Sequence, residues 1–118
     1  MFQTVFNLIQ NKLPENWEKM AFFASYFDGG YMMKYYVRIG GNYQDCYDLS
    51  PESEVEMVFS EIDKVIEPER AKLDDKKRWN VFTMIVSNDG SMKSEFEYKD
   101  ISDDEIEYIK SWKKKYLD

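Results

Sequence analysis

The chain has 118 residues, a length that suits one domain and is too short for two ordinary ones. Its 43% hydrophobic and 17% aromatic content excludes an intrinsically disordered chain. The formal net charge of −7 argues against direct nucleic-acid binding, because an acidic surface repels phosphate groups. The same charge would attract a basic partner, although solubility alone would also account for it.

The N-terminal part of the chain predicts one helix and two strands. Apolar residues at helical spacing predict an amphipathic helix over residues 2–13, which Pro14 ends because the residue before a proline avoids the α region. Residues 17–27 are apolar and aromatic on both faces, which predicts a well-buried strand. Two glycines favour a turn at residues 28–30, and residues 31–39 predict a second strand.

The middle of the chain predicts a short strand and a long helix. A glycine turn at residues 40–42 leads into the strand, over residues 43–47. Ser50 and Pro51 then predict the start of the helix, with Ser50 as the cap and Pro51 in the first helical position. Pro68 is expected to interrupt or kink this helix. The helix carries an apolar stripe made of Val55, Val58, Phe59, Ile62, Val65 and Ile66.

The C-terminal part predicts a β-hairpin and a last helix. Residues 79–86 and 92–98 have the composition of strands, and Asp89-Gly90 favours a turn between them. Ser102 and Glu105 have the spacing of a capping box and are expected to begin the helix. Its apolar stripe consists of Ile106, Ile109, Trp112 and Tyr116.

These elements follow one another in the order α-β-β-β-α-β-β-α. Because hairpin turns join most of the strands, we predict an α+β fold, a single domain over residues 1–118 with a mainly antiparallel five-stranded sheet. The lone Cys46 cannot form an intramolecular disulfide. No apolar run is long enough to span a membrane and no secretion signal is evident at the N-terminus, so we expect a soluble, cytoplasmic protein.

The residue inventory offers little for catalysis. The absence of histidine and the single cysteine remove histidine-based nucleophiles, histidine metal sites and cysteine-rich zinc sites. Each glycine turn leads into a strand rather than a helix, which argues against a phosphate-binding loop. The densest acidic group, which is expected to stabilise a helix start, consists of Asp100, Asp103, Asp104, Glu105 and Glu107. We therefore predict no enzyme activity and no catalytic, cofactor-binding or metal-binding residues.

A second acidic set is the first candidate for partner binding. Four carboxylates are spaced four, seven and four residues apart, so they lie along one flank of the middle helix, beside its apolar stripe. They are Glu52, Glu56, Asp63 and Glu67. Like charges at this spacing repel one another, a cost that a basic partner would offset. A solvated polar face is the alternative explanation.

The surplus of aromatic residues is the second candidate. The first two predicted strands carry large apolar groups on both faces, and three helices can hardly cover both faces of a small sheet. Either a helix wraps to the second face, or some aromatic side chains stay exposed and mark an interface. Tyr31 and Tyr35 are the residues that we assign to such an interface, whereas an ordinary core with scattered surface tyrosines is the alternative.

Short motifs of aromatic, glycine and charged residues follow one another along the chain. They are Leu13-Pro14-Glu15-Asn16-Trp17-Glu18-Lys19, Asp28-Gly29-Gly30 before a tyrosine-rich strand, the Trp79-led hairpin with its acidic end, and Trp112-Lys113-Lys114-Lys115-Tyr116-Leu117. In this order they resemble the YezG-like (EsaG-like) family of bacterial immunity proteins over nearly the whole chain. The resemblance implies a small cytoplasmic antitoxin without catalytic residues, which binds and silences a secreted toxin, often a nuclease.

We therefore predict an immunity protein of bacterial competition. It would neutralise the C-terminal domain of a cognate toxin by stoichiometric binding, and the toxin domain is expected to be basic and a nuclease. No cofactor, nucleic acid or membrane would take part, and the protein would be a monomer or a weak homodimer. The alternative is a secretion chaperone of the acidic class I type III kind, a stable dimer that binds an extended effector segment. A carboxylate-dependent enzyme is a third possibility, and it would need acidic residues that converge in a pocket.

Overall fold

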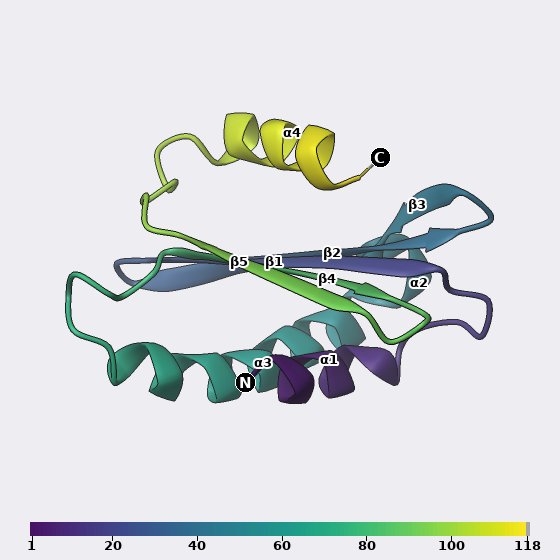
Figure 1. Ribbon diagram of the computed structural model, residues 1–118, viewed down its shortest axis with the longest axis horizontal. Helices are drawn as coiled ribbons and strands as arrows, with labels where there is room; N and C mark the ends of the chain where they lie inside the picture. The colour runs from purple at the N-terminus through teal and green to yellow at the C-terminus, as the bar shows by residue number, and fades with distance from the viewer. Residues whose placement is uncertain (118) are drawn as a thin grey trace.

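The computed structural model describes residues 1–117, in which a five-stranded antiparallel sheet lies between helices on both faces (Figure 1). The strands are β1 (Lys19–Phe27), β2 (Gly30–Ile39), β3 (Asn42–Asp45), β4 (Val81–Ser87) and β5 (Met92–Glu97). The helices are α1 (Phe2–Gln10), α2 (Cys46–Leu49), α3 (Glu52–Ala71) and α4 (Glu105–Tyr116). The predicted α+β class, the five-stranded sheet and the order of the predicted elements are confirmed. None of the helices in the described part is both long and apolar enough to cross a membrane.

The strand order β3-β2-β1-β4-β5 places β1 at the centre of the sheet. The hairpins β1–β2 and β4–β5 use the predicted turns, where Gly29 and Gly90 have φ angles of +88° and +93° that only glycine adopts readily. β3 is short and pairs with β2 only from Tyr36↔Asp45 to Ile39↔Asn42. The long α3 crosses beneath the sheet and returns the chain so that β4 can pair with β1.

One face of the sheet packs on α1 and α3, which lie side by side beneath it in Figure 1. The predicted apolar stripe of α3 is buried there, except that Val65 is partly exposed. The core on this side also includes Val5, Ile9, Phe22, Tyr35, Phe82 and Met84. Alternation along β2 places Met33, Tyr35 and Val37 in this core, with Ile39 packed against it.

The opposite face of the sheet packs on α4. Trp112 is 2% exposed, and its ring centroid lies 4.8 Å from that of Phe23 and 5.8 Å from that of Tyr36. The sequence left open whether a helix reaches the second face or its aromatic residues stay exposed. For Phe23 and Tyr36 a helix does cover that face.

The junction between β3 and α3 differs from the predicted strand over residues 43–47. β3 ends at Asp45, and Cys46 begins the one-turn helix α2. The Asp45 carboxylate caps this turn by accepting a 3.0 Å hydrogen bond from the Tyr47 amide. A side chain that can bond its own backbone two residues on competes with strand pairing, and the turn forms here.

The predicted helix caps are wrong at both sites. Pro51 occupies the N-cap position of α3 and no side chain caps that helix, so Ser50 is not the cap. At α4, Asp104 occupies the N-cap position without a side-chain hydrogen bond, while the Ser102 amide donates to the Asp100 carboxylate in a tight turn. Pro68 does not interrupt α3, which continues for three residues beyond it to Ala71.

Candidate partner-binding surface

The acidic flank of α3 passes close to two tyrosines, because Glu52 and Glu56 lie near Tyr47 of α2 and Asp63 lies near Tyr31 of β2. Phe59 packs edge-on against Tyr35, with ring centroids 6.0 Å apart, which fixes the helix against β2. Glu52, Glu56 and Glu67 are exposed, whereas Asp63 is half-buried. The four predicted acidic residues thus share one flank, but they do not share one environment.

Asp63 is tied into the fold. Its carboxylate accepts a 2.7 Å hydrogen bond from the hydroxyl of Tyr26, which is 5% exposed. Burial, together with this hydrogen bond and the negative charge, raises the pKa of Tyr26 far above its ordinary value. Asp63 therefore fixes the position of α3 on β1 as well as contributing charge to the flank.

Tyr31 lies next to this pair. Its ring centroid is 5.8 Å from that of Tyr26, and its side chain is 37% exposed. Partial burial and the nearby charge of Asp63 both raise the pKa of the Tyr31 hydroxyl. The structure thus brings together Tyr31 and Asp63, two of the predicted contact residues that lie far apart in the sequence.

Arg70 completes the same cluster, although no sequence pattern singled it out. Its guanidinium carbon lies 4.7 Å from the Tyr26 ring centroid and 5.3 Å from that of Trp79, and its Nε donates a 2.9 Å hydrogen bond to the Trp79 carbonyl. Burial lowers the pKa of this guanidinium, and the nearby carboxylate of Glu67 counteracts that effect. A cation held over two rings gives the cluster rigidity.

Tyr35 cannot serve as a contact residue in this fold. It is 1% exposed and packs against Phe59 in the core, and its burial raises the pKa of its hydroxyl to about 12. Tyr31 and Tyr35 lie on the same face of β2, but only Tyr31 is near the end of the strand, where α3 no longer covers it completely. The prediction for Tyr35 is therefore corrected.

Tyr47 is an exposed aromatic residue at the other end of the acidic flank, and no sequence pattern singled it out. It is 42% exposed, and Lys34 Nζ lies 5.1 Å from its ring centroid. Partial burial and the nearby Cys46, Glu56 and Glu52 raise the pKa of its hydroxyl. The acidic flank is thus bounded by one exposed tyrosine at each end, and we call the set of Tyr31, Tyr47, Glu52, Glu56, Asp63 and Glu67 the acidic-aromatic surface.

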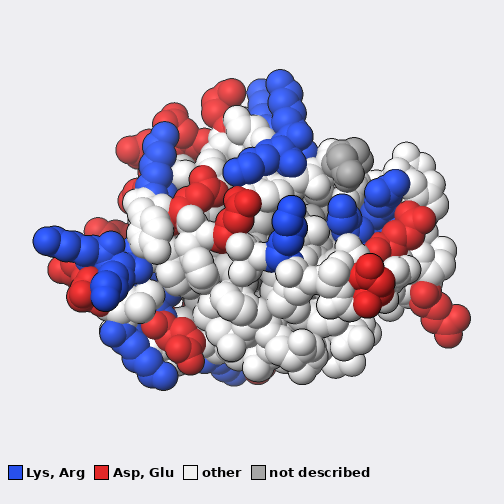
Figure 2. Space-filling model, in the orientation of Figure 1, with Lys and Arg blue, Asp and Glu red and all other residues white. Residues whose placement is uncertain are grey.

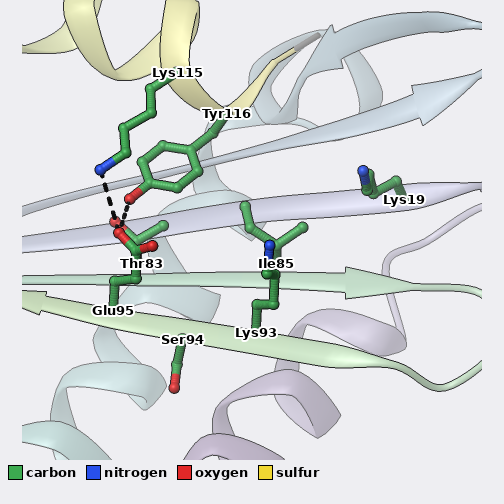
Figure 3. Close-up of a pocket in the computed structure, with 8 residues that line it drawn as sticks. All are labelled: Lys19, Thr83, Ile85, Lys93, Ser94, Glu95, Lys115 and Tyr116. Atoms are coloured by element: carbon green, nitrogen blue, oxygen red, sulfur yellow. Dashed lines mark hydrogen bonds and ion pairs between the residues drawn. The ribbon is translucent and has the colours of Figure 1, made fainter.

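A pocket separate from the acidic-aromatic surface lies on the face of the sheet that carries α4 (Figure 3). It has a volume of about 180 Å³ and is bordered by Lys19, Lys93 and Lys115. The carboxylate of Glu95 accepts hydrogen bonds from the Tyr116 hydroxyl and from Lys115, which lowers the pKa of Glu95. The pocket therefore has a positive lining in an acidic protein, with part of its charge already paired.

The distribution of charge differs between regions of the surface. On the side shown in Figure 2, charged side chains of both signs gather over α4 and toward the two ends of the molecule, and the region over α1 is nearly free of charge. The sequence of α1 contains no charged residue. Within residues 1–117, no group of three or more Cys, Asp or Glu side chains is arranged to hold a metal ion.

Comparison with known proteins agrees with the predicted resemblance. No curated protein matches the chain. The family model described as "Immunity protein YezG-like" matches residues 1–118, which is the full sequence. The chain therefore belongs to the YezG-like immunity protein family.

Proposed function

We propose that this protein binds the C-terminal domain of a cognate secreted toxin and neutralises it by forming a stoichiometric complex. The observation that carries the proposal is the match of the YezG-like immunity family to the whole chain. In this role the protein needs no cofactor and catalyses no reaction. It acts in the cytoplasm of the toxin-producing cell, as a monomer or a weak homodimer, before the toxin is exported.

The acidic-aromatic surface supplies both kinds of contact that such a complex needs. Glu52, Glu56 and Glu67 are exposed and would accelerate the encounter with a basic toxin domain. Exposed ion pairs contribute little to affinity, whereas a nanomolar complex requires roughly −12 kcal/mol. Tyr31 and Tyr47 are the exposed aromatic residues that would bury area at the two ends of the flank.

The toxin domain that fits this surface best is a nuclease. A nuclease binds a polyanion through a basic surface, and an acidic protein can occupy that surface in place of the nucleic acid. The net charge of −7 and the row of carboxylates on α3 have the sign that this competition requires. Inhibition would then follow from occlusion of the nucleic-acid site.

Affinity purification from the source cell, combined with a toxicity assay, tests this proposal. The tagged full-length protein should recover the C-terminal domain of a secreted protein, and expression of that domain should kill cells unless this protein is co-expressed. Recovery of an effector's N-terminal secretion segment, without any protection, would instead indicate a secretion chaperone. A toxin domain that stays active in the presence of excess protein would refute the proposal.

A further inference from the structure

The edge of the sheet at β2 is open over half the length of the strand. β3 pairs with residues 36–39 of β2, and within the described chain no strand pairs with residues 30–35 on that side. α2 lies beside the end of this stretch. Its first residue, Cys46, is buried, and the backbone of Tyr35 forms a hydrogen bond to the Cys46 thiol. The open edge is therefore residues 30–34.

The pairing register shows which backbone groups this edge offers. The Tyr26 amide donates a 2.7 Å hydrogen bond to the Asn80 carbonyl oxygen. The backbone N–H and C=O groups of even-numbered residues of β1 therefore point toward β4, and those of odd-numbered residues point toward β2. Odd-numbered residues of β1 pair with even-numbered residues of β2, as in Ser25↔Met32. The N–H and C=O groups of Tyr31 and Met33 consequently point away from β1, toward the open side.

The surroundings of this edge select a basic occupant. Asp63 of α3 lies beside Tyr31 at one end of this edge, and Glu67 follows one helical turn later on the same flank. Lys34, the one cation in residues 30–34, is already paired with Asp45. An added strand would thus meet unpaired backbone groups beside a row of carboxylates, which a strand carrying Lys or Arg side chains would complement.

A second copy of this chain is a poor occupant. Pairing of two β2 edges about a two-fold axis would bring the acidic flanks of both α3 helices close together, and like charges across an interface oppose association. The edge at β5 differs, because Lys93, Glu95 and Glu97 place both signs of charge along it, a pattern that protects edges against pairing.

We propose that residues 30–34 of β2 bind an extended, basic segment of the partner, which adds to the sheet as a further strand beside Asp63 and Glu67. The backbone groups of Tyr31 and Met33 hold the segment, and α3 selects its charge. This inference rests on the proposed function for the identity of the partner, a toxin domain. Its test uses no toxin, so its failure and the failure of the proposed function are distinguishable.

The first test is an NMR titration of the full-length protein with a capped peptide of about six alternating valine and lysine residues, a length typical of strands. Addition of this peptide should shift the amide signals of residues 31–34 and those along the facing flank of α3. The same peptide with glutamate in place of lysine should not bind, and N-methylation of its alternate amides should abolish binding. No binding, shifts centred on β5 or on the lysine-lined pocket, or equal binding of the N-methylated peptide would overturn the proposal.

A matched pair of variants separates the backbone from the side chain. Tyr31→Ala and Tyr31→Pro both remove the ring, but only Tyr31→Pro removes the outward N–H group, at a position near the start of an edge strand where proline is tolerated. Tyr31→Pro should bind the basic peptide about fivefold more weakly than Tyr31→Ala, as expected for the loss of one hydrogen bond. Equal affinities in variants with the same unfolding midpoint would exclude strand addition at this edge.

Discussion

The indole N–H of Trp112 donates a 3.0 Å hydrogen bond to the hydroxyl of Thr83, and both residues are buried. This bond joins α4 to β4 on the face of the sheet opposite α1 and α3. Two polar groups thus satisfy each other inside an apolar cluster, and the aromatic contacts of Trp112 with Phe23 and Tyr36 surround them.

Truncation of Trp112 should therefore release α4 from the sheet. Trp112→Ala is expected to lower the free energy of unfolding by about 3–5 kcal/mol, as is typical for a buried aromatic side chain. Trp112→Phe keeps most of the packing but leaves the Thr83 hydroxyl buried without its donor, at a cost of about 1–3 kcal/mol. Urea denaturation measures both, and Trp112→Phe combined with Thr83→Val should recover part of the second loss. No recovery would mean that the hydrogen bond is not the source of that loss.

The hydrogen bond between Tyr26 and Asp63 should stabilise the attachment of α3 to β1. Tyr26→Phe is expected to lower the free energy of unfolding by about 1–3 kcal/mol, because the half-buried carboxylate loses a donor. Asp63→Asn keeps an acceptor but removes the charge, so it should cost less. Thermal unfolding followed by circular dichroism measures both changes, and a smaller effect for Tyr26→Phe than for Asp63→Asn would contradict this account.

Stability should fall steeply in alkaline solution. Burial raises the pKa of Tyr26, Tyr36 and Tyr108 far above the ordinary value, and it raises that of Tyr35 to about 12. Tyrosines in the unfolded chain have a pKa of about 10. The stability that these groups contribute is therefore complete below that pH, and it is lost as the pH rises toward their pKa values in the folded protein. Urea midpoints between about pH 8 and pH 11, together with tyrosinate absorbance, measure this loss. Full ionisation of all the tyrosines in the folded protein near pH 10 would contradict the prediction.

Stability should also depend on Asp45 in acid. Burial alone would raise the pKa of this carboxyl, but the hydrogen bonds from Lys34 and the Tyr47 amide lower it below its ordinary value. Its contribution is therefore present above the unfolded pKa of about 4 and is lost as the pH falls through the lower folded value. Asp45→Ala should cost about 1–2 kcal/mol at neutral pH, chiefly through loss of the helix cap and the ion pair. The difference from the unmodified protein should vanish in strong acid, and a constant difference at all pH values would argue against this role.

Charge reversal on the flank of α3 should slow association with the toxin domain. Glu52→Lys combined with Glu56→Lys removes acidic charge from the acidic-aromatic surface, whereas Glu54→Lys combined with Glu61→Lys makes the same change on the opposite flank. The first pair should lower the association rate about tenfold and weaken its dependence on salt, since steering is a charge effect. The second pair is the matched control. Surface plasmon resonance measures both, and equal effects would mean that net charge rather than this flank steers binding.

The sequence predicted the sheet well because its signals are local. Glycine turns and strand composition are recognised within a few residues, and they indicated both hairpins. The helical position of the acidic residues on α3 followed from the 3.6-residue repeat alone.

Other features depend on which elements meet in space, and the sequence did not indicate them. The burial of Tyr35 follows from the position of α3 on β2, and the role of Arg70 follows from the arrival of Trp79 beside Tyr26. The two predicted helix caps were wrong for a related reason. Ser50 and Ser102 have the residue type of a cap, but Asp45 and Asp100 bond to nearby amides and form turns just before the helices.

The central position of β1 has a consequence for synthesis on the ribosome. One edge of β1 can pair with the adjacent β2 soon after synthesis, but its other edge pairs with β4, which is synthesised much later. The hydrogen bond from the Asn80 side chain to the Tyr26 carbonyl, for example, joins residues 54 positions apart. Until the ribosome has delivered β4, the emerging chain exposes an apolar strand with an unpaired edge, which is a template for aggregation. Closure of this long loop should be the slow step of folding, and chaperone dependence should be greatest for nascent chains that end within α3.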